Sequence, residues 1–211
     1  MFLHRKLTLT YVLIIVNIVI YVFTSFFSGG ILETSQRIME DYGQLNSAMF
    51  EGQIWRLFTA LFIHANIIHV LGNSFFLLIF GLRAENLFSM REYLFTYFFC
   101  GVIGGSLSLL LGPNVVSVGA SGAIFGLLGA TMIYIRRIIG QSMLSALAYA
   151  FFFFVITSFG PGVNYYAHLG GLVAGLLIGY MLAAKRKRKR APTYEYTYSF
   201  YSASQKTNEL Q

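Results

Sequence analysis

Two long hydrophobic stretches of the chain each contain one side chain that could take part in acyl transfer. Ser121 lies within Gly119-Ala120-Ser121-Gly122, and His168 lies within Ala167-His168-Leu169-Gly170-Gly171. Polar and ionisable side chains are costly inside a bilayer, and by default they mark a functional site there. A serine hydroxyl becomes an effective nucleophile when a base takes its proton, and histidine titrates near neutral pH. The pattern therefore predicts a Ser121–His168 catalytic pair.

Acyl transfer also needs hydrogen-bond donors at the place where negative charge develops on the carbonyl oxygen. His69 and Asn73 are four residues apart, so they share one face of a helix, and both side chains can donate hydrogen bonds. The backbone N–H of Ser121, near the start of a helix, is free to join them. These three donors predict an oxyanion site. Without Ser121, His69 and Asn73 would be explained equally well as hydrogen-bond links between helices.

Glycine spacing supplies a way to bring the serine and the histidine together. Glycines repeat every three or four residues in both stretches: Gly122, Gly126 and Gly129 after Ser121, and Gly171, Gly175 and Gly179 after His168. Stripes of small residues allow helix backbones to approach closely in lipid. If two helices pack along these stripes, Ser121 and His168 meet near the outer ends of the helices. The stripes alone would be explained better by generic helix packing.

The elements that must position these residues are membrane helices. The chain has 211 residues, of which 56% are hydrophobic and only 11% are charged, whereas a soluble domain carries about a quarter charged residues. Six uncharged runs are near or above the ~20 residues that cross a bilayer as a helix: 7–27, 57–80, 93–111, 115–135, 138–159 and 163–184. The runs lack the alternation that is typical of spanning strands. The sequence therefore predicts an all-α polytopic membrane protein, a six-helix bundle.

Charge placement predicts the orientation of this bundle. If the spans alternate, the basic residues fall on one side of the membrane, apart from Arg37 and Arg56. An excess of basic residues marks the cytoplasmic side, so both termini are expected in the cytoplasm of a multi-pass plasma-membrane protein. The first run is too long for the ~7–15 residues of a signal-peptide core, and we expect it to be retained. The basic run Lys185–Arg190 is expected to anchor at an anionic inner leaflet rather than to bind nucleic acid.

The sequence predicts three regions: a cytoplasmic segment at 1–6, the helical domain at 7–184, and a basic, then Tyr/Ser-rich cytoplasmic tail at 185–211.

The second, fourth and sixth spans run inward, so the polar residues near their starts share the outer half of the membrane: His64, His69, Asn73, Ser121 and His168. The site is therefore expected to open to the outer face. No Asp or Glu lies in the outer half of a span, so the pair would be a dyad with no carboxylate to orient the base. His64 is offset by about 140° from His69 on an ideal helix, and we expect it to tie the first loop to the helix start.

Taken together, these motifs resemble the rhomboid family of intramembrane serine proteases. The resemblance covers the six-helix core and rests on these residues: Trp55-Arg56, His64, His69 and Asn73, Gly81-x-x-x-Glu85, Gly119-Ala120-Ser121-Gly122, and His168-x-x-Gly171-x-x-x-Gly175. It implies Ser121 as nucleophile, His168 as general base and acid, and an oxyanion site made by His69, Asn73 and the Ser121 amide. It also implies structural roles for the other residues of these motifs: Trp55, Arg56, His64, Glu85, Gly119, Gly122, Gly171 and Gly175.

One position departs from the family pattern. Many bacterial members carry a tyrosine four residues after the nucleophile, and its ring packs against the catalytic histidine. Here that position is Phe125, which keeps the ring face and loses the hydroxyl. We therefore expect activity to survive, with altered orientation or substrate preference.

The resemblance implies hydrolysis of a peptide bond in or beside a transmembrane segment, with single-span membrane proteins as substrates and lipid as the surroundings. It implies no metal and no organic cofactor. The three intramembrane histidines make a zinc site conceivable, but they lack the His-Glu-x-x-His arrangement of zinc proteases. Two alternatives are weaker. A non-catalytic rhomboid-like protein that binds membrane clients would lack Ser121 or His168, and a small transporter would carry polar residues beyond the single Tyr180 in 172–182.

Overall fold

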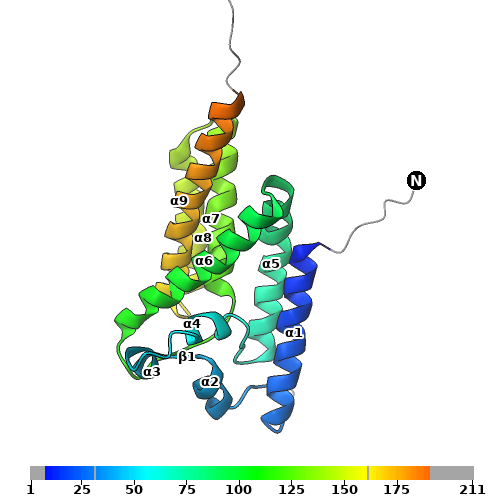
Figure 1. Ribbon diagram of the computed structural model, residues 1–211, viewed down its shortest axis with the longest axis vertical. Coiled ribbons are helices and arrows are strands. Elements are labelled where there is room, and N and C mark those ends of the chain that lie inside the picture. The colour runs from blue at the N-terminus through cyan, green and yellow to red at the C-terminus, as the bar shows by residue number, and fades with distance from the viewer. Residues whose placement is uncertain (1–7, 31, 161, 191–211) are drawn as a thin grey trace, which may run out of the picture.

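The computed structural model describes residues 8–30, 32–160 and 162–190. Within these residues, six long helices form the bundle shown in Figure 1. They are α1 (Leu9–Phe27), α5 (Ile67–Leu87), α6 (Met90–Ser108), α7 (Ser121–Ile138), α8 (Met143–Ser158) and α9 (Tyr165–Arg190). The helices alternate in direction, so α5, α7 and α9 all begin at the same end of the bundle (Figure 1).

The hydrophobicity of these helices fits a membrane. Four helical segments are long and apolar enough to cross one: Leu9–Phe27, Ile67–Leu87, Met90–Leu111 and Tyr165–Arg186. Helix α8 is apolar but shorter, and α7 is buried without interruption from Gly122 to Thr131 because α5, α6, α8 and α9 all pack on it. The predicted fold class, an all-α polytopic bundle, is confirmed.

The second hydrophobic run does not form one helix from residue 57. Its first residues belong to the short α4 (Arg56–Thr59), and α5 begins only at Ile67. Asn66 sets this start, because its side-chain oxygen accepts the backbone N–H of His69 at 2.8 Å, as N-cap residues do. The prediction that His64 lies on the same helix as His69 is therefore wrong, and so is the angular offset that we inferred from it.

Two further helix boundaries differ from the hydrophobic runs. Val116–Ser117 forms β2, which pairs with β1 (Gln44–Leu45) in an antiparallel register, so the fourth helix begins at Ser121 and not at residue 115. Gly119 lies between β2 and this helix with a φ of 110°, a left-handed conformation that favours glycine. The sixth helix continues to Arg190, past the predicted end at residue 184, so the basic run is part of the helix.

The connection from α1 to α5 folds over the end of the bundle where α5, α7 and α9 begin (Figure 1). It contains α2 (Gln36–Tyr42), β1, α3 (Asn46–Phe50) and α4. Gln44 docks this connection on α6, because its Nε2 donates to the Gly105 carbonyl and to Ser108 Oγ, both at 2.8 Å. The 3-10 helix η1 (Leu109–Leu111) follows α6 and leads towards β2. We call the end of the bundle where α5, α7 and α9 begin the loop end.

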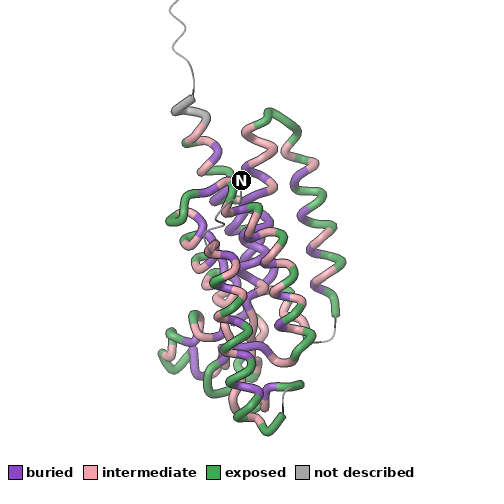
Figure 2. The backbone as a smooth tube through the Cα atoms, turned by 90° about the vertical axis from the view of Figure 1, so that its right-hand side faces the viewer, coloured by how far each residue is buried: buried purple, intermediate pink, exposed green. Residues whose placement is uncertain are grey.

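Helices α7 and α9 approach so closely that their backbones touch. A Cβ atom added to a glycine of α9 would collide with a carbonyl oxygen of α7: Gly171 with that of Gly122 at 2.0 Å, Gly175 with that of Gly126 at 2.1 Å, and Gly179 with that of Ala130 at 2.2 Å. Buried residues accordingly gather along the centre of the bundle (Figure 2). The predicted packing of two helices along their glycine stripes is confirmed.

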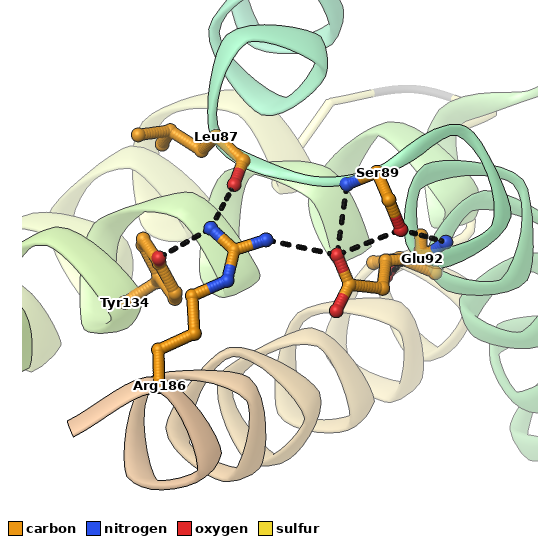
Figure 3. Close-up of polar contacts among 6 residues, drawn as sticks. Leu87, Ser89, Glu92, Tyr134 and Arg186 are labelled. Carbon is orange, nitrogen blue, oxygen red and sulfur yellow. Dashed lines mark hydrogen bonds and ion pairs between the residues drawn. The ribbon is translucent and has the colours of Figure 1, made fainter. Parts of the chain in front are cut away.

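Arg186 fastens the opposite end of α9 to three other helices (Figure 3). Its guanidinium donates to the Leu87 carbonyl at the end of α5, to Tyr134 Oη on α7 at 2.5 Å, and to Glu92 Oε2 on α6 at 2.9 Å. Glu92 is held in turn by Ser89, whose backbone N–H and hydroxyl both donate to the same carboxylate oxygen. This network closes the bundle at the end away from the loops.

Arg186 therefore departs from the role predicted for the basic run Lys185–Arg190. Its guanidinium binds protein groups and is not free to anchor at lipid. Lys185 is exposed, and its side chain has no hydrogen bond or ion pair with a residue that the structure describes. The side chains of residues 187–190 lie outside the described part of the chain, so lipid anchoring stays a prediction for the rest of the run.

The contacts between glycines of α9 and the backbone of α7 predict that one added methyl group there lowers the stability of the protein. In Gly175→Ala the new Cβ would meet the Gly126 carbonyl, which is backbone and cannot rotate away. Overpacking of this kind costs about 1–3 kcal/mol, so the thermal unfolding midpoint in detergent should fall. Gly72→Ala is the matched control, since an added Cβ on this α5 glycine meets no atom within 4 Å. Equal midpoints for wild type and Gly175→Ala would contradict the backbone contact.

The network around Arg186 predicts a second stability effect. Arg186→Ala removes a charged donor from Glu92, Tyr134 and the Leu87 carbonyl, and hydrogen bonds to charged groups contribute about 1.5–3 kcal/mol. The midpoint of thermal unfolding in detergent should therefore fall, whereas the neighbouring Lys185→Ala should leave it nearly unchanged. If both variants lower the midpoint equally, the loss reflects the charge of the basic run and not this network.

Candidate active site

Ser121 is the first residue of α7, and its position follows from the turn that precedes it. Gly119 donates its N–H to the Ala60 carbonyl at 2.8 Å, and Ala120 is the N-cap residue, with no side chain that could cap the helix. The first four N–H groups of a helix have no acceptor within the helix. The Ser121 amide and hydroxyl therefore both lie at a helix N-terminus, where the helix dipole favours negative charge.

His69 lies directly against this turn. A Cβ atom added to Gly119 would lie 2.6 Å from His69 Nε2 and 3.8 Å from Asn73 Nδ2, so both side chains face the backbone just before Ser121. Asn73 Nδ2 donates one hydrogen bond to the His69 carbonyl at 2.9 Å, which leaves its second N–H free. The two donors that share one face of α5 thus lie beside the start of α7, as their spacing predicted.

His168 lies in the first turn of α9, which begins beside β2. Asn164 caps this helix, because its Oδ1 accepts the N–H of Ala167 at 3.0 Å, and its Nδ2 donates to Ser117 Oγ at 2.7 Å. Ser117 belongs to the strand that leads into the Ser121 turn. The helix that carries the histidine and the segment that carries the serine are therefore tied together at their starts.

Two contacts fix the His168 ring. Phe125, one turn after Ser121 on α7, stacks on it with a centroid distance of 4.4 Å and an interplanar angle of 25°. Ser158, the last residue of α8, places its Oγ 2.9 Å from His168 Nδ1. Both side chains and the imidazole are buried. The ring face expected of Phe125 is therefore present, whereas the contact with Ser158 was not predicted.

Ser158 was missed although the sequence contained a signal for it. It lies at the end of the fifth hydrophobic run, at the same end of the bundle as the other polar residues. The partner expected to orient a catalytic histidine is a carboxylate, and the sequence has no Asp or Glu at this depth. A hydroxyl can also orient an imidazole, because it both donates and accepts hydrogen bonds.

One cavity of about 740 Å³ brings these residues together. Its walls include Ser121, His168, His69 and Asn73, and much of the remaining surface is apolar or aromatic, as with Phe76 and Phe153. The structure records no hydrogen bond between Ser121 Oγ and the His168 ring. Catalytic hydrogen bonds are often long before substrate binds and tighten in the reacting complex. The cavity can therefore hold a nucleophile, a base and donors for an oxyanion around one substrate group.

Arg56 organises the first loop and does not itself line the cavity. Its guanidinium donates to the carbonyl oxygens of Glu40 at 2.5 Å and Gly43 at 2.8 Å, and to Gln53 Oε1 at 2.8 Å. The charge also lies 4.7 Å from the centre of the Trp55 ring, a cation–π distance. Arg56 and Trp55 thus connect separate parts of the loop to each other.

Glu85 and His64 also make contacts within the fold. Glu85, at the opposite end from the cavity, accepts the N–H groups of Leu9 and Thr10 at 2.8 and 3.1 Å and so caps α1. His64 is fully buried, and its ring lies 5.2 Å from that of His69. Its carbonyl accepts a hydrogen bond from Thr34 Oγ1 at 2.8 Å, so the His64 backbone links the first loop to the segment before α5.

No group of three or more His, Cys, Asp or Glu residues within 8–30, 32–160 and 162–190 is arranged to hold a metal ion. The cavity offers a serine hydroxyl, two imidazoles and neutral hydrogen-bond donors, which are groups that acyl transfer uses.

Comparison with known proteins identifies relatives of the chain. The model of the Rhomboid domain matches residues 51–185. The chain is 35% identical over 158 residues to RHOMBOID-like protein 1 of Arabidopsis thaliana, which covers 72% of the chain and 41% of the relative. It is 32% identical over 176 residues to Rhomboid-like protease 3 of Toxoplasma gondii, covering 78% of the chain and 65% of the relative. A Putative rhomboid protease YdcA of Bacillus subtilis (strain 168) is 33% identical over 149 residues, 68% of the chain and 75% of the relative. The match thus spans less than two thirds of the first two of these relatives.

Proposed function

Because the chain belongs to the rhomboid family, we propose that it is an intramembrane serine endopeptidase that hydrolyses peptide bonds in or next to transmembrane segments. Two of its relatives are named as proteases. The observation that carries the proposal is the convergence of Ser121, His168, His69 and Asn73 on one cavity. Family membership and the apolar helices make the chain an integral membrane protein.

In the proposed reaction Ser121 Oγ attacks the carbonyl carbon of the scissile bond while His168 takes the hydroxyl proton. The carbonyl oxygen becomes an oxyanion, which accepts hydrogen bonds from the Ser121 amide, His69 and Asn73. His168 then gives its proton to the leaving amine as the C–N bond breaks. In the second half, His168 takes a proton from water, water attacks the acyl-enzyme, and the proton returns to Ser121 as the acid product leaves.

The substrates proposed are single-span membrane proteins that reach the cavity from the surrounding lipid. A stable transmembrane helix satisfies its own backbone carbonyls, so the segment to be cut must unwind locally before attack. The location proposed is the plasma membrane. The distribution of basic residues supports an orientation with both termini in the cytoplasm and the cavity open to the outer face. Arg83, Arg91, Arg136 and Arg137 lie at the end away from the loops, which supports that end as cytoplasmic.

The first test is cleavage of a model single-span substrate by the purified protein in liposomes. Ser121→Ala and His168→Ala should each abolish cleavage, because one removes the nucleophile and the other removes the base. Ser145→Ala is the matched control: this serine on α8 donates only to the Ser142 carbonyl of its own chain segment and does not line the cavity. If wild type and Ser121→Ala bind substrate equally and neither cleaves it, the proposed protease function is contradicted and a client-binding function is favoured.

A second test concerns the proposed oxyanion site. Asn73→Ala and His69→Ala should each lower kcat by about 10²–10³, as loss of one such donor does, with a smaller change in KM. Ser74→Ala is the control from the same helix, since its hydroxyl has no partner within the described chain and does not line the cavity. A rise in KM at constant kcat would instead assign His69 and Asn73 to substrate binding.

A further inference from the structure

We propose that Ser158 is a positioning residue, whose hydroxyl holds His168 through Nδ1 and thereby keeps Nε2 available to Ser121. This inference rests on the proposed function, because it assigns His168 the role of base. Ser158 lies on α8, a helix that carries none of the residues that the motifs identified. It is 1% exposed, so water does not compete for the hydrogen bond to the imidazole.

The stacking of Phe125 cannot by itself orient the base. A half-turn of the imidazole about the Cβ–Cγ bond leaves the ring in the same plane, so Phe125 would stack equally well on both orientations. The same half-turn puts a carbon atom where Nδ1 was and another carbon atom where Nε2 was. The Ser158 hydroxyl distinguishes the two orientations, because only a nitrogen can share its hydrogen bond of 2.9 Å. Phe125 thus fixes the plane of the ring and Ser158 fixes its rotation.

The proton count also favours a hydroxyl at this position. In the neutral imidazole that can act as base, Nδ1 carries the proton and Nε2 carries the lone pair. Ser158 Oγ then accepts a hydrogen bond from Nδ1–H. It accepts the same hydrogen bond when Nε2 has taken the proton of Ser121 and both nitrogens are donors. The hydroxyl needs no rearrangement of heavy atoms between these two states. The hydrogen bond between Ser158 and His168 is therefore present both before and after the proton transfer.

A purely structural role for Ser158 would have different consequences. The hydrogen bond joins the end of α8 to the first turn of α9, and α8 stands at the edge of the bundle (Figure 2). If the bond only held α8 in place, its loss would loosen the cavity wall formed by Phe153 and Thr157. Substrate binding and thermal stability would then suffer, while the intrinsic reactivity of Ser121 would remain.

The experiment compares wild type, Ser158→Ala and Ser158→Thr as full-length purified proteins. The first readout is the rate at which a fluorophosphonate, a small serine-directed reagent, modifies Ser121. We expect Ser158→Ala to lower this rate and kcat together by about fivefold to tenfold, the worth of one hydrogen bond, with KM unchanged. Ser158→Thr keeps a hydroxyl and should restore most of both rates. Ser145→Ala controls for the loss of a hydroxyl elsewhere on α8.

The second readout does not depend on activity. In protein labelled with nitrogen-15 histidine, His168→Ala identifies the His168 signals, and Ser158→Ala should change the Nδ1 signal from a single proton-bearing state to a mixture of tautomers. Labelling of Ser158→Ala at the wild-type rate, or a raised KM with unchanged kcat, would overturn the positioning role. Failure of the proposed function would look different: wild-type protein itself would neither react at Ser121 nor cleave substrate, and the positioning role would fall with it.

Discussion

The contact between the backbones of α7 and α9 is the constraint on which the rest of the molecule depends. Helices in lipid gain little from burying apolar surface against each other, so they associate through close packing and hydrogen bonds. Glycine allows this because a carbonyl oxygen of one helix can lie where the Cβ of the other would be. The closest of these contacts, Gly171 on Gly122, lies one residue from Ser121 and three residues from His168. The same contact that holds the bundle together therefore also holds Ser121 and His168 near each other.

A second constraint comes from where the helices begin. At the loop end, α5, α7 and α9 start inside the hydrophobic runs and not at their edges. Each start leaves backbone N–H groups that need partners. Asn66 caps α5 and Asn164 caps α9, whereas α7 begins without a side-chain cap. Gln44, Ser108, Ser117 and Asn164 form one series of hydrogen bonds from the first loop to the start of α9. Asn164 thus both caps α9 and, through Ser117, holds the Ser121 turn and the His168 helix side by side.

Much of this arrangement could be predicted from the sequence, and the exceptions have physical reasons. Depth and spacing placed Ser121, His168, His69 and Asn73 near one another, because hydrophobic runs fix the direction of each span and glycine stripes fix which helices meet. The boundaries of the second and fourth helices could not be read from hydrophobicity, because an N-cap or a short strand is compatible with apolar neighbours. The partners of single polar residues were equally hidden. Nothing local to Arg186 indicates that Glu92 lies beside it, and the depth of Ser158 does not by itself show that its partner is His168, since those pairs are made by tertiary packing.

The distribution of charge between the two ends of the bundle explains why a hydroxyl and not a carboxylate meets the imidazole. Burial of an ionised carboxylate is costly unless donors or cations satisfy it. Glu85 and Glu92 lie at the end away from the loops, where the start of α1 and the guanidinium of Arg186 supply such partners. Around His168 the neighbours are the Phe125 ring, the Ser158 hydroxyl and apolar walls, and none of them could compensate a permanent negative charge. In the proposed reaction a neutral partner leaves the cavity uncharged before attack, so the helix N-terminus at Ser121 would stabilise charge that arises only in the transition state.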